Sequence, residues 1–563
     1  MKRQKIEKLP SFSNLLYPSE LSLQAAAQYK NDQKKPYNVL NKKLAESETK
    51  RNSIKPRKVI AHWFVRDFRI SDNHGLSKAY EMAAKNKLPL VAFWVKCPKL
   101  SEAHGDSDFK KYYRSLSLQQ VHSKLAKLNI TLVTVEADEK KDIVPAIQSF
   151  CTKYDVSHLF ANLEYEVDEL RLFTSAHDNL LKSNTALMPY HDSCVVEPGE
   201  LKTKSKGTQF AVFTPWYKAW VKFVNDNYFS EKNFVYPDIQ KVESTIEVDE
   251  TADFDVGNVD TDRFEKYWKL VGEDGAREAL TNYIKSEQIK KYDEDRDFLD
   301  EDAPSQLSIH ISSGTLSTRT ILQELFNAKM LKSKQSSYTG VSEWVRQVSW
   351  RDFYKHIMCN WPYICMYKPF QLELSDLHWE YNNDHFLLWC EGATGFPVVD
   401  ACMRCLNETG YLNNRGRLIV ACFLAKDLLI DWRYGEQYFM SKLVDGDLAS
   451  NNGGWGFAAS TGVDPQPYFR IFNPWTQSEK FDPEGNFIRK WVPELANLKG
   501  KAIHNPHSSN SDVEGYPTPI VEHKACRERA LERYKEAMAK GKKLERSVLR
   551  YKEVFRLNEI LCN

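Results

Sequence analysis

The sequence lacks a hydrophobic run long enough to cross a membrane. No stretch of about 18 apolar residues occurs anywhere in the 563 residues. The N-terminus also lacks the apolar core of a secretory signal. We therefore expect no membrane span and no membrane partner.

Two nucleotide-binding motifs and a regular cysteine pattern are also missing. Neither GxGxxG nor GxxxxGK[ST] occurs, so neither a dinucleotide fingerprint nor a P-loop is supported. The 11 cysteines are scattered and odd in number, which favours a reducing compartment over a disulfide framework. Cys402 and Cys405 form a CxxC without a second pair at zinc-ribbon spacing, so we interpret them as packed thiols and expect no metal.

The chain as a whole has no large excess of charge of either sign, but its N-terminal segment is basic. The net charge is +2, yet residues 1–58 carry 14 Lys and Arg against 5 Asp and Glu. Residues 1–57 are predicted to be a basic, disordered targeting extension. Delivery to the nucleus is expected, with the mitochondrion as the alternative.

Hydrophobic patterning predicts two domains and a connection. Buried strands are predicted at 58–65, 88–96, 130–137 and 158–165. Helical stretches alternate with them, which is typical of a parallel sheet with helices on both faces. The expected organisation is an α/β domain at 58–190, an interdomain linker at 191–260, a helical domain at 261–540 and a helical tail at 541–563.

The stretch DGDLASNNGGWGFAASTG, residues 445–462, combines small, polar and aromatic side chains. Gly453 and Gly454 allow a backbone to approach a flat ligand. Asp445, Asp447 and Asn451 add fixed hydrogen-bonding groups, and Trp455 adds a redox-capable ring. This composition suits contact with a polar ring system, and the alternative interpretation is a glycine-rich surface loop.

Six motifs together resemble one known family. They are WRDFYKH (350–356), ATGFPVVDACMR (393–404), GYLNNRGR (410–417), KDLLIDWRYGEQYF (426–439), LVDGDLASNNGGWGF (443–457) and DPQPYFRIFNPWTQSEKFDPEGNFIRKW (464–491). The chain resembles the class I cyclobutane pyrimidine dimer (CPD) DNA photolyases of the photolyase/cryptochrome family, on the fungal-like side. The resemblance implies an α/β N-terminal domain with a parallel doubly wound sheet, followed by a larger all-α FAD-binding domain.

The resemblance implies which residues hold FAD. The matching positions are Tyr292, Ser305, Leu307, Ser308, Trp344, Arg417, Asp445, Gly446, Asp447 and Asn451. Asn451 is implied to face flavin N5, where asparagine is the choice of photolyases. Pro304 stands where the family usually has threonine and removes both a hydroxyl and a backbone N–H from the phosphate-binding segment.

The resemblance also implies the reaction, in which light-excited reduced FAD gives one electron to the dimer, the ring splits and the electron returns. Trp455, Trp432 and Trp379 match a chain of tryptophans that carries electrons to the flavin. The alternative interpretation is three core indoles. Gln347 and Asn451 complete the implied catalytic set.

A flipped-out dimer is implied to stack between Trp350 and Phe457. The full implied set of substrate and DNA contacts is Arg296, Gln347, Trp350, Asn414, Arg415, Leu418, Phe457, Arg470 and Gln477, with Lys355 as a further backbone contact. Leu418 replaces a usual Met, a volume-conserving change. Gln347 replaces the usual Glu and cannot offer a protonated carboxyl, which predicts weaker repair than in a relative with Glu.

A second chromophore is implied at His104, Asp168, Glu169 and Cys365, which match a folate antenna pocket for 5,10-methenyltetrahydrofolate. Met366 replaces a folate-binding Lys there, and a remnant pocket is the alternative.

Two other functions compete with dimer repair. The first is a cryptochrome-type blue-light photosensor without efficient repair, which Gln347 favours and Asn451 opposes. The second is a DNA-binding module with a structural flavin. The segment LNNRGRL contains no histidine, which disfavours (6-4) repair. We expect a monomer whose partner is DNA with pyrimidine dimers.

Overall fold

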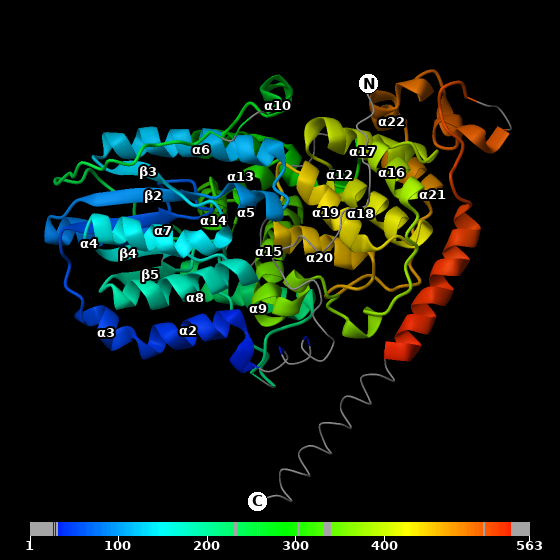
Figure 1. Ribbon diagram of the computed structural model, residues 1–563. Helices are drawn as coiled ribbons and strands as arrows, with labels where there is room; N and C mark the ends of the chain where they lie inside the picture. The colour runs from blue at the N-terminus through cyan, green and yellow to red at the C-terminus, as the bar shows by residue number, and fades with distance from the viewer. Residues whose placement is uncertain are drawn as a thin grey trace, which may run out of the picture.

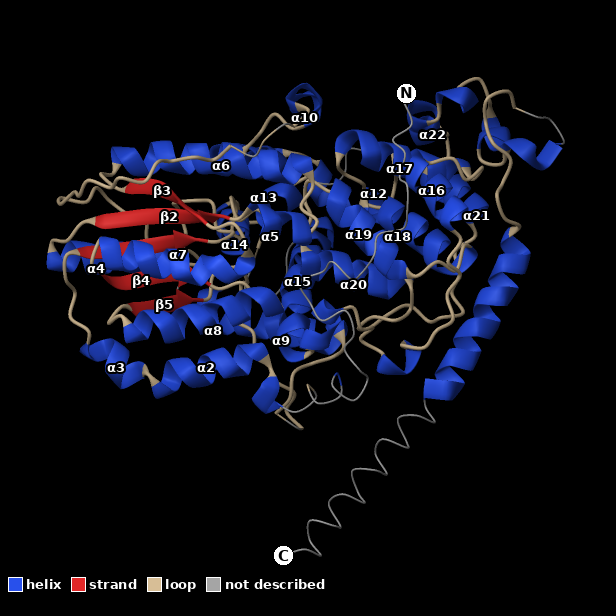
Figure 2. Ribbon diagram, viewed as in Figure 1, coloured by secondary structure: helices blue, strands red, loops and turns tan. Residues whose placement is uncertain are grey.

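The computed structural model describes residues 32–205, 207–229, 233–255, 259–300, 305–331, 339–509 and 513–541, together with residues 26, 29 and 257. An α/β half lies beside a helical half (Figures 1 and 2). The strands all belong to the first half, and the helix at 523–541 runs along the outer side of the second.

Five parallel strands form the sheet of the α/β half. They are β1 (Val59–Phe64), β2 (Leu90–Lys96), β3 (Thr131–Glu136), β4 (Val156–Asn162) and β5 (Ala186–Tyr190). Their order is β3-β2-β1-β4-β5, so the predicted parallel sheet is confirmed. Strand β5 was not predicted, because it has only five residues and includes Pro189. A proline is tolerated there because β5 is an edge strand.

Helices cover both faces of the sheet, as expected for parallel strands such as β1 and β4, which are buried along their whole length. Helices α4 (His74–Asn86) and α6 (Asp108–Lys127) pack on the face that carries Ile60 and Phe64 of β1. The other face carries Val59, Ala61 and Trp63. It is covered by α7 (Lys140–Lys153) and α8 (Val167–Lys182).

Residues 1–57 are expected to be disordered from the sequence, and this expectation is wrong for residues 36–53. Residues 36–53 form α2 (Pro36–Glu46) and α3 (Glu48–Ser53). Tyr37, Leu40 and Leu44 recur every three or four residues and pack onto the α8 side of the sheet. These three apolar residues lie on one side of α2 and dock it on the sheet domain. Residues 1–25 lie outside the described part of the chain.

The expected linker at 191–260 is an ordered part of both halves. Helix α9 (Phe213–Val224) buries Trp216 and Trp220 in the core that surrounds α15 (Thr339–Asn360). The chain then returns over the α/β half, where Ile239 and Phe254 join the core beneath α4 and α6. This segment therefore fastens the two halves together.

The helical half contains most of the remaining helices. The shorter ones are α10 (Thr261–Tyr267), α12 (Tyr292–Asp295), α13 (Ser308–Ser312), α16 (Asn383–Glu391), α18 (Asn414–Cys422), α21 (Pro474–Phe481) and α22 (Asn486–Trp491). The longer ones are α11 (Gly272–Lys285), α14 (Thr318–Asn327), α17 (Pro397–Thr409), α19 (Trp432–Lys442), α20 (Leu448–Ala458) and the helix at 523–541. Among the described residues, no helix is long and apolar enough to cross a membrane.

The glycine-rich stretch 445–462 is not a surface loop. Residues 448–458 form α20, whose first turn is capped by Asp447, since Oδ1 of Asp447 accepts a hydrogen bond from the Ser450 N–H at 2.9 Å. A Cβ atom on Gly453 would lie 2.3 Å from the Tyr354 ring. Glycine at this position therefore allows α20 to pack directly against α15.

Candidate active site

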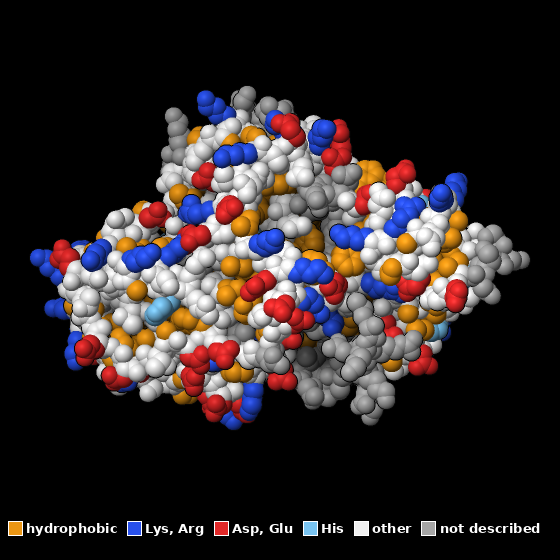
Figure 3. All heavy atoms as spheres, turned by 90° about the horizontal axis from the view of Figure 1, so that it is seen from above, with side chains coloured by type: hydrophobic (Ala, Val, Ile, Leu, Met, Phe, Trp, Pro, Cys, Tyr) orange, Lys and Arg blue, Asp and Glu red, His pale blue; other side chains and the backbone are white. Residues whose placement is uncertain are grey.

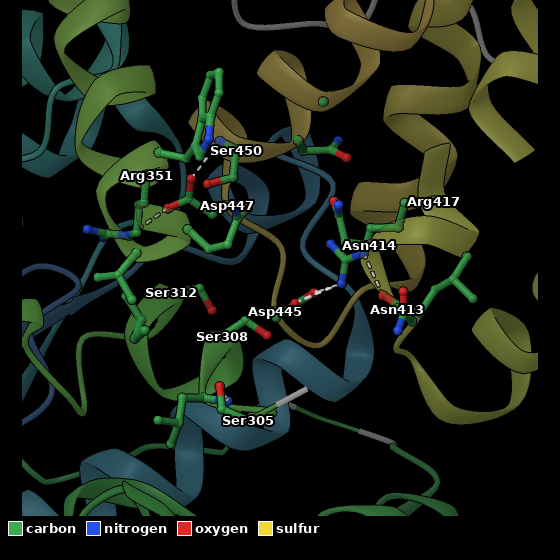
Figure 4. Close-up of a pocket in the computed structure, with 18 of the residues that line it drawn as sticks. Ser305, Ser308, Ser312, Arg351, Asn413, Asn414, Arg417, Asp445, Asp447 and Ser450 are labelled. Atoms are coloured by element: carbon green, nitrogen blue, oxygen red, sulfur yellow. Dashed lines mark hydrogen bonds and ion pairs between the residues drawn. The ribbon is translucent and has the colours of Figure 1, made fainter. Parts of the chain in front are cut away.

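One cavity of about 520 Å³ opens into the helical half and has the size of a cofactor or ligand site. Its walls come from α15, α18, α20 and the segment that contains α13. Figure 4 shows serine side chains on one wall, with Asp445, Asp447, Arg351 and Arg417 facing them.

The cavity brings together most of the residues that the family resemblance implied. Nine of the ten implied FAD residues line it: Tyr292, Ser305, Leu307, Ser308, Trp344, Arg417, Asp445, Asp447 and Asn451. Six implied substrate residues also line it: Arg296, Gln347, Trp350, Asn414, Leu418 and Phe457. Gly446 is not among the lining residues. It is buried below the cavity wall beside Met440, and only the side chains on either side of it face inward.

Hydroxyl groups form one wall. Ser305, Ser308 and Ser312 project toward the cavity (Figure 4). The hydroxyl of Thr318, which also lines the cavity, is buried without a hydrogen-bond partner within the described residues. A buried unpaired hydroxyl is rare unless a ligand or water satisfies it. This wall therefore suits a ligand rich in hydrogen-bonding oxygens. Pro304 lies outside the described residues.

An ion pair between Arg417 and Asp445 forms the opposite wall. Nη2 of Arg417 lies 2.8 Å and 3.0 Å from the two carboxylate oxygens of Asp445. Nε of Arg417 donates to the Leu412 carbonyl at 2.8 Å, which fixes the guanidinium. The side chain of Asp445 is 3% exposed and that of Arg417 is 27% exposed. The cavity thus offers a carboxylate and a guanidinium in a fixed arrangement.

Asp447 presents a second fixed carboxylate at the start of α20. Burial would raise the pKa of Asp447, but the charges of Lys355 and Arg351 and the bond from Ser450 outweigh burial and hold the pKa well below its usual range. Nε of Arg351 lies 3.6 Å from Oδ2 of Asp447. The sequence interpretation missed Arg351, although it directly follows Trp350 in the motif WRDF.

The amide of Asn451 has a fixed orientation. Its Nδ2 donates to the Glu436 carbonyl at 2.9 Å, so its Oδ1 is left as an acceptor on a residue that lines the cavity. Burial raises the pKa of the neighbouring Glu436 carboxyl to about 7, although a hydrogen bond from Asn452 opposes this. The Oδ1 atom of Asn451 is therefore a neutral acceptor on a residue of the cavity wall.

Three tryptophans lie in one buried cluster that begins at the cavity. Trp455 lines the cavity, and a Cβ on Gly435 would lie 2.1 Å from its ring, so Trp455 packs directly on α19. Trp432 is one turn earlier in α19. The Glu380 N–H donates to the Leu429 carbonyl at 2.7 Å, which places Trp379 beside the segment that leads into α19. All three indoles belong to one hydrophobic core.

Trp350 of the cavity wall has a stacking partner that the sequence did not suggest. Trp350 stacks on Phe213 with ring centroids 3.6 Å apart and an interplanar angle of 7°. Phe213 begins α9, more than a hundred residues before Trp350. One indole face is therefore covered, and Phe213 holds the ring firmly in place.

Several implied DNA contacts lie outside the cavity wall. Arg415 donates to Asp297 at 2.7 Å and stacks over Phe481. Arg470 is exposed, and Gln477 is half-buried.

The expectation that Lys355 contacts DNA is wrong. Its side chain is 1% exposed, and its Nζ lies 2.9 Å from Oε2 of Glu164 in the α/β half. A lysine in this position balances buried carboxylates and cannot reach a phosphate in solution.

A second cavity of about 190 Å³ lies between the two halves. His104, Glu169 and Cys365 of the implied antenna set line it. Asp168 does not line it, because its carboxylate is paired with His104 at 3.1 Å and with Lys140. Three of the four implied antenna residues are therefore brought together.

Charges of both signs are mixed over the face shown in Figure 3, around a hollow with apolar side chains. This agrees with the small net charge of +2. Cys402 and Cys405 are buried free thiols in α17. No group of three or more potential metal ligands occurs among the residues described.

Comparisons with known proteins give a consistent result. A family model described as the FAD binding domain of DNA photolyase matches residues 344–536, and one described as DNA photolyase matches residues 60–232. The chain is 40% identical to the deoxyribodipyrimidine photo-lyase of Neurospora crassa, over 93% of this chain and 89% of that protein. It is 37% identical to the mitochondrial deoxyribodipyrimidine photo-lyase of Saccharomyces cerevisiae, over 94% and 96%. The crystal structure of a bacterial class III photolyase from Agrobacterium tumefaciens matches with a TM-score of 0.74 and 29% identity, over 86% of this chain and 98% of that chain.

Proposed function

This chain belongs to the DNA photolyase family, and from that premise we propose how its cavity carries out the light-dependent splitting of cyclobutane pyrimidine dimers. The activity is that of a deoxyribodipyrimidine photo-lyase that uses FAD.

The main cavity fits FAD. Its serine wall and the unpaired Thr318 hydroxyl suit the many oxygens of a dinucleotide. The Arg417–Asp445 pair and the Asn451 amide suit the polar edge of a flavin ring. When bound and reduced, FAD absorbs blue light and supplies the single electron that opens the dimer and is then recovered.

Asn451 and Asp447 adjust the electrostatics around the flavin. Asn451 presents a neutral acceptor, which receives a flavin N–H without taking up a proton. Asp447 remains ionised because Lys355 and Arg351 compensate for its burial. Both groups are fixed before any ligand binds, which is the condition for effective electrostatic stabilisation.

A path for electron transfer is formed by Trp455, Trp432 and Trp379. Along it the protein would reduce an oxidised flavin. The contact of Trp455 with Gly435 of α19 supports the first step of this path. Trp379 supplies its outer end, because it lies beside the segment that leads into α19.

Trp350 and Phe457 receive the flipped-out dimer at the mouth of the cavity. A damaged base pair is cheap to unstack, so an aromatic pocket selects dimers over intact bases. Asn414 and Leu418 complete the pocket wall. Arg415, Arg470 and Gln477 contact the DNA backbone around it, which needs only a local positive surface.

The second cavity is proposed to hold a folate antenna against His104, Glu169 and Cys365. The protein acts as a monomer. The basic residues that precede α2 direct it to the nucleus and also to the mitochondrion, as the name of the yeast relative suggests.

The observation that supports the proposal is that one cavity is lined both by the Asn451 amide and by the aromatic rings of Trp350 and Phe457. The test is repair of a dimer-containing oligonucleotide by purified protein under blue light, with an absorption spectrum recorded first. Trp455→Phe should block light-driven reduction of the flavin, yet repair should persist once the flavin is reduced chemically. Absence of light-dependent repair by the wild-type protein, with reduced FAD bound, would exclude the function.

A further inference from the structure

Helix α15 carries a carboxylate on the cavity wall that the family resemblance did not assign. Glu343 lines the cavity one turn before Gln347. Residues four apart lie on the same side of a helix, and Nε2 of Gln347 donates to Oε1 of Glu343 at 2.7 Å. The position that departs from the family pattern therefore has an acidic neighbour.

This contact sets the orientation of the Gln347 amide. An ionised carboxylate can only accept hydrogen bonds, so only the nitrogen side of the amide can face Glu343 favourably. Rotation of the amide by half a turn would place two oxygens against each other. Gln347 therefore keeps its Oε1 and its second N–H available on the cavity side.

Glu343 is itself held from two directions. Its Oε1 forms an ion pair with Arg296, and its Oε2 lies 3.2 Å from Nη1 of Arg346. Its side chain is 21% exposed, so solvent only partly screens these charges. The carboxylate charge of Glu343 is thus balanced and held in place on the cavity wall beside Gln347.

We propose that Glu343 is a positioning residue for the substrate, acting through Gln347; this rests on the proposed function. An adjacent acceptor and donor on Gln347 match the N–H and C=O edge of a pyrimidine in the flipped dimer. A fixed amide makes both bonds without first selecting an orientation. Through Glu343, this chain recognises the dimer with the oriented amide of Gln347, at the position where relatives use a carboxyl.

The test is a double-mutant cycle on the FAD-containing protein. Glu343→Ala, Gln347→Ala and the double variant are compared for binding to a dimer oligonucleotide and to its undamaged counterpart in the dark. Each single change should weaken dimer binding relative to undamaged DNA by about two- to tenfold, the range for one hydrogen bond. The double variant should be no weaker than Gln347→Ala alone.

Two further variants keep the result interpretable. Glu494→Ala removes a carboxylate of similar exposure that pairs with Arg404 away from the cavity, and it should leave dimer discrimination unchanged. Glu343→Gln keeps the shape of the side chain if the alanine variant does not fold, and it should still reduce discrimination.

Additive losses in the double variant, or unchanged discrimination in Glu343→Gln, would overturn the role of Glu343. Loss of repair and discrimination in the wild-type protein would instead overturn the proposed function, and this inference with it.

Discussion

Two amide side chains in this cavity have fixed directions because each donates a hydrogen bond to a backbone carbonyl or to a carboxylate. Asn451 is tied to the Glu436 carbonyl, and Gln347 is tied to Glu343. Neither amide can exchange its donor and acceptor sides without losing a hydrogen bond. The cavity wall therefore presents a defined pattern of donors and acceptors at these two positions.

The expected weakness of repair caused by Gln347 remains a prediction, and Glu343 makes it more specific. Gln347→Glu should raise the quantum yield of repair because it restores the carboxyl of related enzymes. The gain should be small, since two carboxylates one turn apart repel each other. The double variant that exchanges the two residues, Glu343→Gln with Gln347→Glu, should show a larger increase in quantum yield, because the new carboxyl then has an amide neighbour. The quantum yield of repair at saturating dimer DNA is measured for both variants. Equal yields in the wild type and the double variant would contradict the prediction.

At the scale of elements, α20 depends on glycine at places where other helices would carry side chains. Gly453 of α20 admits the ring of Tyr354 from α15, and Gly435 of α19 admits the ring of Trp455. Gly454 has no atom within 4 Å of a Cβ position, and it lines the cavity. The glycines thus serve two purposes, helix packing and ligand space.

Gly435→Ala and Gly454→Ala separate these two purposes. The new Cβ at 435 would overlap the buried Trp455 ring, so we expect a loss of about 1–3 kcal/mol in the free energy of unfolding and slower light-driven reduction of the flavin. The new Cβ at 454 meets open cavity and favours the helix by roughly 0.5–1 kcal/mol. Gly454→Ala should therefore be slightly more stable than wild type without FAD but bind FAD more weakly. Denaturant unfolding and FAD titration measure the pair, and wild-type FAD affinity in Gly454→Ala would show that α20 does not face the flavin.

These glycines also show where sequence reasoning ends. The hydrogen-bonding character of Asp445, Asp447 and Asn451 was readable, because small polar residues around Trp455 have few other uses. Helix α20 could not be predicted in the same way, because each glycine lowers helix propensity by about 1 kcal/mol. Packing of α20 against α15 offsets this cost, and that contact is not visible in the local sequence. The stacking of Phe213 on Trp350 joins positions 137 residues apart, which no local pattern encodes.

At the scale of the whole molecule, a buried ion network joins the two halves. Lys355 of α15 lies 2.9 Å from Glu164 and 3.6 Å from Glu166, which follow β4. Nη1 of Arg66 lies 3.1 Å from Glu166 on the side of the second cavity. Burial would raise the pKa of Glu166, but Lys355 and Arg66 outweigh burial and lower it to about 2. Each charge in the network therefore depends on its partners.

Lys355→Met tests whether this residue joins the two halves or contacts DNA. Burial alone would lower the pKa of Lys355, but Glu164 and Glu166 raise it well above its usual value, so the amine is charged. Its removal leaves two buried carboxylates without their main counter-ion, which should cost about 3–5 kcal/mol of the free energy of unfolding. Adding Glu164→Gln should recover part of that loss, because one unpaired charge is then removed.

The folded Lys355→Met variant should bind DNA as wild type does. By contrast, Arg470→Ala, at an exposed position, should weaken DNA binding and leave stability unchanged. Thermal unfolding and DNA titration distinguish the cases, and a Lys355→Met protein with wild-type stability but weakened DNA binding would restore the DNA contact that the sequence suggested.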